Sequence, residues 1–419
     1  MDRYVVRPGA PLSGTVRASG MTKNAGLKQM AAALLAPGTT VLHNITPVVD
    51  LDVMIELLGA IGVDVTFDGA STLRIAVPET LVPEAPYELV SKMRASINVL
   101  GPLLARTGQA HVAMPGGDNI GSRKLDMHFA ALESMGVELA VVHGYIDARC
   151  NALCGARVVL EFPSVGATET VLTTAALAKG ESVIENAARE PEVVDLAALL
   201  CEMGAHIEGA GSSTIRIEGV DGLVPVERSI VGDRVETVTL MMACASAGGD
   251  ITIEGIDFAD LEMVGRKLAE MGVDVTPVPD GVRVRRDGRA PAVDVQTLPF
   301  PGFSTDFMPL AVAVLATSDG TAVVTENIFD NRFAFVDELN RMGADIRTEG
   351  GHAIVRGVPL LSGAPVRAHD VRAGAALVIA GLAADGETEV LDAHHVERGY
   401  PDLPGKLRAL GADVERISS

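Results

Sequence analysis

The chain has 419 residues, of which 48% are hydrophobic and only 3% aromatic, and it contains no tryptophan. This length and composition predict a globular protein of two domains with aliphatic cores. A net charge of −21 argues against nucleic acid or an anionic membrane surface as a partner, and it makes any cluster of cations a candidate functional site.

The N-terminus and the cysteines add further expectations. The opening residues, MDRYVVRPGAPLSG, contain no apolar signal core, and no apolar run has the length of a membrane span, so we expect a cytoplasmic protein. We expect the four cysteines to be reduced, and Cys150 and Cys154 lack the second ligand pair that a zinc site needs. No metal or cofactor is expected, because neither a dinucleotide fingerprint nor a P-loop is present.

In chain order, six copies of one unit recur at intervals of about 70 residues. Each copy has a small-residue apolar helix that we expect to be buried, a strand that follows a glycine, and an amphipathic helix that ends at a second glycine. Alternating helices and strands predict parallel pairing with right-handed crossovers. Three copies per domain place the boundary within residues 222–236. The helix-ending glycines are Gly62, Gly136, Gly204, Gly272, Gly343 and Gly411, and the glycines before strands are Gly38, Gly108, Gly180, Gly249, Gly320 and Gly386.

The most informative run is MPGGDNIGSRKLDMH, at residues 114–128. Its glycines leave the backbone mobile, so Asp118 lies on a segment that is free to swing, with Arg123 at its far end. Helical spacing of apolar residues follows, with Asp126 near the start of the helix. We interpret the run as a mobile lid that carries an acid and an arginine; the alternative is an ordinary glycine turn with a solvated aspartate.

Motifs along nearly the whole chain carry a family resemblance. SGMTKNAGL, KMRASINVLGPL, MPGGDNIGSRKLDMH, FPSVGATE, ENAAREPEVVDLA, FSTDF, TENIFDNRF, HDVRAGAALV and ERGYPDLPGKLRALGA occur in this order. Together they resemble the UDP-N-acetylglucosamine 1-carboxyvinyltransferase family of enolpyruvyl transferases, which opens peptidoglycan precursor synthesis. The combination is highly specific for the superfamily and less specific for the acceptor.

The resemblance implies a fold and a reaction. The fold is α/β, with two inside-out barrels built from the six units and the active site in the cleft between the domains. The N-terminal barrel would comprise residues 22–231 and carry the mobile loop 114–124, and the C-terminal barrel would comprise residues 1–21 and 232–419. The reaction adds an acceptor hydroxyl to C2 of phosphoenolpyruvate and then expels phosphate.

Two carboxyl groups match the catalytic positions of the family. Asp118 stands where many members carry a cysteine proposed as the acid that protonates C3, and it would have to stay protonated until use. Asp306 matches the residue that contacts the sugar hydroxyl, and would be the general base. An alternative for Asp306 is an N-cap of the apolar helix that follows.

Further residues match the substrate contacts of the family. Cations from distant parts of an acidic chain fit a carboxylate and a phosphate, whereas a lone arginine is usually a surface charge. The N–H groups that start a helix after Ser164 can hold a diphosphate, and Arg332 is a further candidate. Phosphoenolpyruvate would be bound by Lys23, Arg94, Arg123, Arg372 and Arg398, with Lys23 and Arg398 also catalytic; the acceptor by Asn24, Arg123, Lys124, Leu125, Asp126, Ser164, Val165, Gly166, Asp306 and the backbone of Ile328; and Asp50, Glu190, Asp233 and Asp370 would orient the cations, or be caps or solvated acids.

Departures from the family pattern leave alternatives open. Asp118 replaces the thiol that fosfomycin alkylates, so we expect fosfomycin resistance. Lys124 replaces a usual proline and Met308 a common glutamine, which suits an enzyme acting on another uridine nucleotide, such as UMP in nucleoside-antibiotic synthesis. The sister enzyme that uses shikimate 3-phosphate is disfavoured, because its PGSKS-type motif is absent. A non-catalytic six-repeat binding scaffold would explain the repeats but not the lid or the cations.

Overall fold

The computed structural model describes residues 2–118 and 120–418, and the chain divides into two compact units. The N-terminal unit comprises Gly20–Gly117 and Arg123–Val231. The C-terminal unit comprises Met1–Ser19, Asp118–Ser122 and Gly232–Ser419. The middle of the expected mobile loop is therefore grouped with the C-terminal unit, whereas the family resemblance assigns the whole loop to the N-terminal barrel. Within the described residues, none of the helices is long and apolar enough to cross a membrane.

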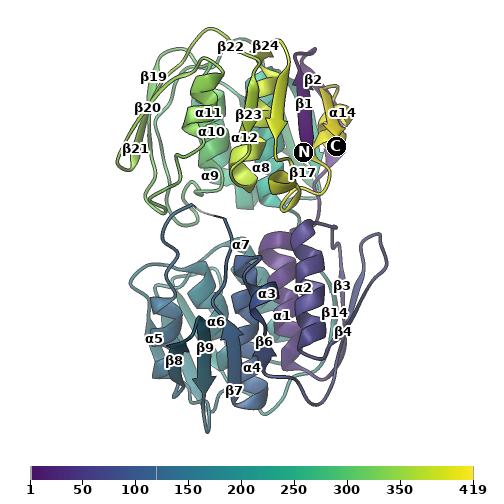
Figure 1. Ribbon diagram of the computed structural model, residues 1–419, viewed down its shortest axis with the longest axis vertical. Helices are drawn as coiled ribbons and strands as arrows, with labels where there is room; N and C mark the ends of the chain where they lie inside the picture. Colours follow the sequence, from purple (N-terminus) through teal and green to yellow (C-terminus); the bar gives the residue numbers. More distant parts are fainter. Residues whose placement is uncertain (1, 119, 419) are drawn as a thin grey trace. The chain divides into compact units, whose positions relative to one another are not determined.

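The N-terminal unit surrounds buried helices with three four-stranded sheets, counted over the described residues (Figure 1). Its inner segments are η1 (Thr22–Gly26), α1 (Leu27–Ala32), η2 (Ala33–Leu35), η3 (Arg94–Val99), α4 (Leu100–Thr107) and α6 (Val165–Ala175); its outer helices are α2 (Val49–Ala60), α3 (Tyr87–Val90), α5 (Asp126–Ser134) and α7 (Pro191–Glu202). The sheets, in strand order, are β14 (Glu227–Ser229), β3 (Gly38–His43), β5 (Leu73–Val77) and β4 (Asp64–Phe67); β6 (Glu84–Ala85), β7 (Gln109–Ala113), β9 (Tyr145–Arg149) and β8 (Glu138–Val142); and β10 (Arg157–Val159), β11 (Glu181–Glu185), β13 (Thr214–Glu218) and β12 (His206–Glu208).

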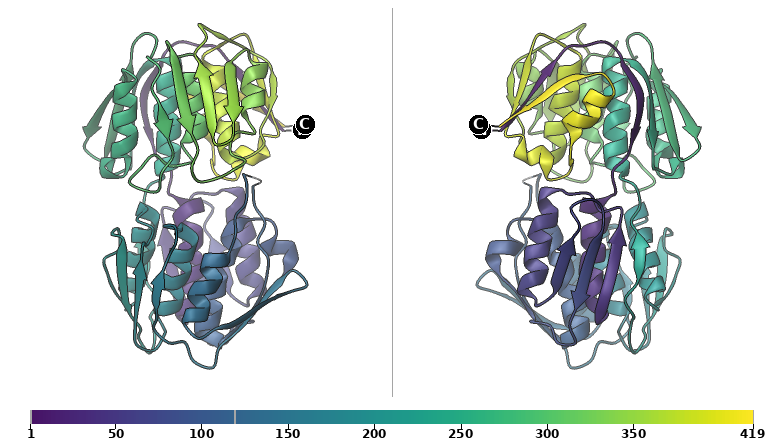
Figure 2. Two further views of the ribbon diagram at one scale, coloured as in Figure 1. Left: turned by 90° about the vertical axis from the view of Figure 1, so that its left-hand side faces the viewer. Right: turned by 90° about the vertical axis from the view of Figure 1, so that its right-hand side faces the viewer.

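The C-terminal unit repeats this plan, and Figure 2 shows its sheets from two sides. Its inner helices are α8 (Arg234–Ala247), α10 (Met308–Leu315) and α12 (Val371–Leu382); its other helices are η4 (Phe258–Leu261), α9 (Glu262–Glu270), α11 (Val336–Arg341), α13 (His394–Glu397) and α14 (Leu403–Ala409). Its sheets, in strand order, are β16 (Asp274–Val278), β17 (Gly281–Arg286), β15 (Gly249–Glu254) and β2 (Leu12–Arg17); β18 (Val295–Gln296), β19 (Thr321–Thr325), β21 (His352–Arg356) and β20 (Asp345–Glu349); β23 (Pro365–Arg367), β25 (Thr388–Leu391), β1 (Arg3–Arg7) and β26 (Asp413–Ile417); and the short pair β22 (Leu361–Ser362) and β24 (Ala384–Asp385).

The expected burial of the small-residue helices is confirmed. Every residue of α10 and α12 is buried, and α8, α10 and α12 pack against one another. The outer helices instead bury one face: α2 buries Leu51, Met54 and Leu57, while Asp52 and Glu56 on its other face are not buried. Helices therefore form the core of each unit and the sheets cover them, which is an inside-out α/β barrel.

The repeat glycines have the backbone conformation that the sequence predicts. The six helix-ending glycines have φ between +72° at Gly272 and +109° at Gly204. The glycines that precede the strands also have positive φ, from +72° at Gly108 to +131° at Gly249. Side chains with a Cβ rarely adopt this region, so glycine at these twelve positions sets where each helix stops and each strand starts.

The prediction of parallel pairing is wrong for most strand pairs. In each four-stranded sheet one pair is parallel and two are antiparallel, as in β14, β3, β5 and β4. In five of the six four-stranded sheets of the described residues, the strand after the amphipathic helix turns back as a hairpin, and the returning strand inserts between the two strands that the helix connects. In the sixth, β1 takes the place of the returning strand. The first two strands join the C-terminal unit, because β1 lies between β25 and β26 and β2 pairs with β15.

A close approach between α4 and α6 gives a stability prediction. A Cβ on Gly101 would lie 2.6 Å from Thr174 Oγ1 and 2.7 Å from Thr173 Oγ1. Both hydroxyls already donate to carbonyl groups of the preceding turn, so they resist displacement. We expect Gly101→Ala to lower the free energy of unfolding by about 1–3 kcal/mol.

Denaturant unfolding measures this loss, and Gly59 supplies the control. Gly59 lies on the exposed side of α2 with nothing within 4 Å of a built Cβ. Gly59→Ala should therefore stabilise the chain by roughly 0.5–1 kcal/mol through the lower backbone entropy of alanine. Equal effects of the two substitutions would contradict the close approach.

Candidate active site

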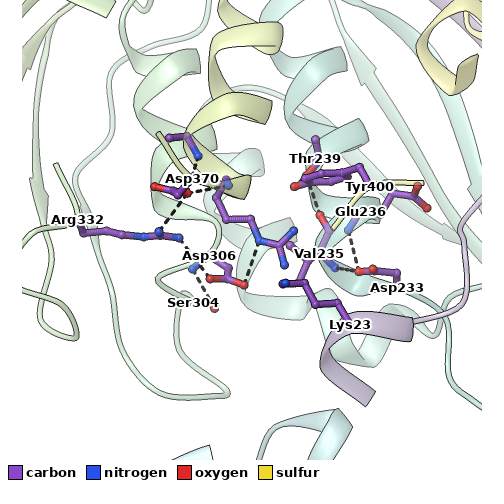
Figure 3. Close-up of polar contacts among 12 residues, drawn as sticks. Lys23, Asp233, Val235, Glu236, Thr239, Ser304, Asp306, Arg332, Asp370 and Tyr400 are labelled. Carbon is purple, nitrogen blue, oxygen red and sulfur yellow. Dashed lines mark hydrogen bonds and ion pairs between the residues drawn. The ribbon is translucent and has the colours of Figure 1, made fainter. Parts of the chain in front are cut away.

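Asp306 lies just before α10 and is held by two guanidinium groups. Arg372 Nε donates to Asp306 Oδ2 at 3.2 Å, and Arg332 Nη2 donates to Asp306 Oδ1 at 3.4 Å. Figure 3 shows Arg332 between Asp306 and Asp370. The alternative that Asp306 caps the helix is wrong, because Phe307 occupies the N-cap position and the helix start has no side-chain cap.

These cations set the protonation of Asp306. Burial alone would raise the pKa of this carboxyl group, but the charges of Arg372, Arg332 and Arg234 outweigh burial and hold the pKa at about 2. Asp306 is therefore a permanent anion near neutral pH. Its side chain keeps 27% of its surface exposed, so a ligand can still reach the carboxylate.

Asp370 supports the same arginines through a helix cap. It is the N-cap residue of α12, and its Oδ1 accepts the N–H groups of Arg372 at 2.8 Å and Ala373 at 3.0 Å. The same oxygen lies 3.4 Å from Arg332 Nη1. The two expectations for Asp370, a cap and a partner of cations, are therefore both met by one carboxylate.

Asp233 caps α8 in the same way but has the opposite electrostatic surroundings. Its Oδ1 accepts the N–H groups of Val235 at 2.8 Å and Glu236 at 2.9 Å. Burial, with the neighbouring charge of Glu236, raises the pKa of Asp233 to about 7, against the opposing pull of Arg372. This acid exchanges a proton near neutral pH, which Asp306 does not.

Tyr400 completes the surroundings of Arg372 and was not predicted from the sequence. The Arg372 guanidinium carbon lies 5.2 Å from the centre of the Tyr400 ring, and the Tyr400 hydroxyl is 2.7 Å from Thr239 Oγ1. Burial raises the pKa of the Tyr400 hydroxyl, so the ring stays neutral. The Tyr400 ring packs against one face of the Arg372 guanidinium, and the ion pair with Asp306 sets the direction in which its N–H groups point.

Asp118 is paired with Arg398. Arg398 Nη1 donates to Asp118 Oδ1 at 2.6 Å, and the two side chains are only 16% and 15% exposed. The same segment is attached to the C-terminal unit at two more points: Ser122 N–H donates to Asp330 Oδ1 at 3.0 Å, and Asn331 N–H donates to the Ile120 carbonyl at 3.3 Å. The expected acid thus lies beside an expected phosphoenolpyruvate cation.

The N-terminal unit holds the other expected cations. Lys23, in η1, forms an ion pair with Asp50 in the first turn of α2. Arg94, at the start of η3, donates to the backbone carbonyl of Arg123 and, at 3.4 Å, to that of Lys124. Burial, with the nearby charge of Arg123, lowers the pKa of Arg94 to about 10. Two guanidinium groups at one place attract an anion.

The start of α6 offers N–H groups next to a histidine. Ser164 is the N-cap and its hydroxyl accepts the Ala167 N–H at 3.3 Å, so the first-turn N–H groups of Val165 and Gly166 have no acceptor within the helix. A Cβ on Gly166 would lie 2.8 Å from His128 Nε2, so glycine is needed there. Burial and the Arg94 charge lower the pKa of His128 to about 4, which keeps the ring neutral. His128 was not predicted to be a site residue, although it ends the loop motif.

The remaining expected residues have varied positions. Leu125 is buried and Asp126 begins α5, while Lys124 is exposed. Asn24 lies in η1 and Glu190 at the N-cap position of α7. The Ile328 N–H donates to Glu326 at 2.7 Å, so its carbonyl is the group left for a ligand. Met308 is fully buried in α10.

Comparisons with known proteins identify the family to which the chain belongs. Residues 6–407 match the family EPSP synthase (3-phosphoshikimate 1-carboxyvinyltransferase). The chain is 51% identical to a UDP-N-acetylglucosamine 1-carboxyvinyltransferase of Corynebacterium jeikeium and 49% identical to that of Mycobacterium tuberculosis, with 99% of each chain covered. It resembles the solved structure of the enolpyruvyl transferase NikO from Streptomyces tendae, with a TM-score of 0.89, 27% identity, and coverage of 100% of this chain and 99% of that one. EPSP synthase from Acinetobacter baumannii, at 18% identity and a TM-score of 0.73 with both chains fully covered, shares the fold.

The ion pairs of Asp306 predict a pH-dependent stability. Its folded pKa of about 2 lies below the ordinary aspartate value of about 3.9, so the carboxylate stabilises the fold above about pH 4 and this contribution is lost as the pH falls toward 2. We expect Asp306→Asn to lower the free energy of unfolding at pH 7 by roughly 1–3 kcal/mol, after a discount for the exposed part of the side chain.

Urea unfolding between pH 2 and 7 measures the effect. The difference between the wild type and Asp306→Asn should shrink through the window from about pH 4 to about pH 2. A difference that stays constant across this window would mean that the arginines do not stabilise the Asp306 carboxylate.

Proposed function

Because the chain belongs to the UDP-N-acetylglucosamine 1-carboxyvinyltransferases of the EPSP synthase family, we propose that it transfers the enolpyruvyl group of phosphoenolpyruvate to the 3-hydroxyl of UDP-N-acetylglucosamine, releasing phosphate. This is the first committed step of peptidoglycan precursor synthesis. The observation that carries the proposal is the exposed edge of Asp306 between two buried arginines, since it provides an anion for a hydroxyl group beside cations for a carboxylate and a phosphate. We infer that the enzyme acts in the cytoplasm, where both substrates are made.

The addition step needs a base and an acid. We propose that Asp306 accepts the proton of the acceptor hydroxyl as its oxygen forms a bond to C2, while Asp118 gives a proton to C3. A carboxylate with a pKa of about 2 is a weak base. It therefore holds the hydroxyl by a hydrogen bond and receives the proton only as C2 becomes electrophilic and the alcohol becomes acidic.

The elimination step reverses the proton transfer at C3. The C2–oxygen bond to phosphate breaks, a proton returns from C3 to the Asp118 carboxylate, and the double bond of the enolpyruvyl ether forms. Asp306 gives the proton that it took from the alcohol to the leaving phosphate. Lys23, Arg94, Arg123, Arg372 and Arg398 would hold the carboxylate and the phosphate throughout, and the phosphate carries the negative charge away. Metal ions and cofactors have no part in this proposal.

Arg398 connects substrate binding to the acid. The Asp118 carboxyl group occupies Arg398 at 2.6 Å. An incoming phosphate or carboxylate competes for the same guanidinium, because it carries the same kind of oxygen. We propose that phosphoenolpyruvate displaces the Asp118 carboxylate from Arg398, and that the freed carboxylate takes up a proton from water, which it then gives to C3.

The acceptor side would use the N-terminal unit. The N–H groups at the start of α6, with the loop residues after Arg123, are suited to a diphosphate and a uridine. Asn24 and the Ile328 carbonyl would contact the sugar or the nucleotide. Asp50, Asp233, Asp370 and Glu190 would orient the cations and the helix starts.

An acceptor panel tests the proposed function. We expect phosphate release from phosphoenolpyruvate with UDP-N-acetylglucosamine, and at least a hundredfold less with UMP or shikimate 3-phosphate, because a site built for specific polar groups rejects a substrate that lacks them. Release with UMP alone would replace the proposal with a nucleotide-modifying enzyme. No release with any acceptor would favour a binding scaffold.

Fosfomycin tests the role given to Asp118. A carboxylate is a poorer nucleophile toward the epoxide than a thiolate, so we expect no change in the mass of the wild-type protein after incubation with the drug. Asp118→Cys should gain the mass of one drug molecule, mapped to residues 114–124, and lose activity with it. A wild-type adduct on this loop would contradict the prediction, and Cys154, an exposed thiol present in both proteins, controls for non-specific alkylation.

A further inference from the structure

Glu169 is a buried carboxylate that the proposed chemistry does not use. It lies in the first half of α6 with 2% of its surface exposed. A buried carboxylate is costly unless cations and hydrogen-bond donors compensate for the loss of water. Its partners therefore need an explanation.

The partners come from two other segments of the N-terminal unit. Lys28, in α1, places its Nζ 3.1 Å from Glu169 Oε1. Asn98, in η3, donates from Nδ2 to Glu169 Oε2 at 3.1 Å. The Lys28 ammonium group also donates to the backbone carbonyl of Asn24 at 3.0 Å. Each oxygen of the one carboxylate thus holds a different segment.

Each of these segments carries expected substrate groups. The segment η1, which Lys28 holds through Asn24, contains Lys23 and Asn24. The segment η3, which Asn98 belongs to, begins with Arg94. Helix α6 begins at the N–H groups of Val165 and Gly166. The inner segments also pack directly, η3 against both α1 and α6.

We propose that Glu169 is a positioning residue that fixes the phosphoenolpyruvate cations and the diphosphate-binding helix start of the N-terminal unit relative to one another. The inference rests on the proposed function for the identity of the substrates. Glu169 touches neither substrate in this proposal; it acts through Lys28 and Asn98. A displacement of about 1 Å of such groups is enough to reduce turnover strongly.

The charge balance of the network agrees with this role. Burial raises the pKa of the Glu169 carboxyl group, while the ammonium of Lys28 and the amide of Asn98 oppose the rise. Glu192 is the other acid whose charge acts on Glu169, and it raises the pKa further. The carboxylate is therefore stabilised only as long as both partners stay in place, so the three segments are held together or loosened together.

Glu169→Ala is the first test. We expect kcat/KM for both substrates to fall about 10- to 100-fold, because Lys23, Asn24, Arg94 and the start of α6 lose their common support. The shift of Tm caused by saturating phosphoenolpyruvate with UDP-N-acetylglucosamine should shrink in parallel, which reports binding independently of turnover. Ile75→Ala, a fully buried residue of β5, serves as a control for general loss of stability.

A double variant separates positioning from stability. In Lys28→Met/Glu169→Met both members of this buried ion pair are replaced, so neither is left as an unpaired charge and most of the Tm lost in Glu169→Ala should return. The Asn24 carbonyl and the Asn98 amide remain without their partners, so kcat/KM should stay low. Recovery of kcat/KM together with Tm would mean that Glu169 is merely structural and would overturn the proposal.

The outcomes also distinguish the two levels of inference. If the wild-type protein releases no phosphate from phosphoenolpyruvate with any acceptor, the proposed function is wrong. If the wild type is active and Glu169→Ala has kinetic constants and a ligand-induced Tm shift within twofold of the wild-type values, the positioning role is overturned. The proposed function would still stand in that case. Equal losses in Glu169→Ala and Ile75→Ala would overturn it as well.

Discussion

The charged site of the C-terminal unit depends on one electrostatic constraint: its arginines can be buried only because they form ion pairs with neighbouring aspartates. Arg372 and Arg332 are 4% and 3% exposed, and a buried guanidinium without an acid costs several kcal/mol. Asp306 and Asp370 supply the acids. Because these four side chains come from the starts of α10 and α12 and from the segment before α11, the ion pairs can form only when the helices are already packed. Folding of the C-terminal unit and assembly of its charged site are therefore one event.

The six-copy repeat explains why charged groups gather at helix starts. In the C-terminal unit, Asp233, Asp306 and Asp370 stand at or just before the first turns of the inner helices α8, α10 and α12. In the N-terminal unit, Lys23 lies in the segment that leads into α1, Arg94 in the one that leads into α4, and Ser164 caps α6. These helices are buried along most of their length, so most of the charged side chains that they carry stand near their ends. The partial positive charge of a helix N-terminus adds to the attraction for anions at each of these positions.

The sequence predicts this fold well where the signal is local. Glycine at Gly62 or Gly411 ends a helix because of its own backbone, and α10 is buried because its residues are small and apolar all round. The sheets were predicted less well, since the hairpin strand that inserts between two others depends on pairing over long distances rather than on periodicity. The spacing of hydrophobic residues distinguishes a helix from a strand, but it does not tell which strands pair. The antiparallel pairs were therefore not predicted.

The candidate site shows the same division. The motifs located Asp306 and Arg372 but did not predict that the two are in contact. They also did not predict the contact of Arg372 with the Tyr400 ring, which lies 28 residues further along the sequence (400 − 372). Met308 comes two residues after Asp306, but it lies in the buried first turn of α10 and its side chain packs in the core. Glu169 ends the motif FPSVGATE, but the motif did not indicate a role for it, because its partners Lys28 and Asn98 are distant along the chain.

Asp233 and Asp306 show how neighbours, rather than residue type, assign chemistry at these helix starts. Both are aspartates of the C-terminal unit, and both are influenced by Arg372. Three arginines hold the pKa of Asp306 at about 2, whereas burial beside Glu236 raises that of Asp233 to about 7. The balance between burial and the neighbouring charges therefore sets which of these two aspartates stays charged near neutral pH.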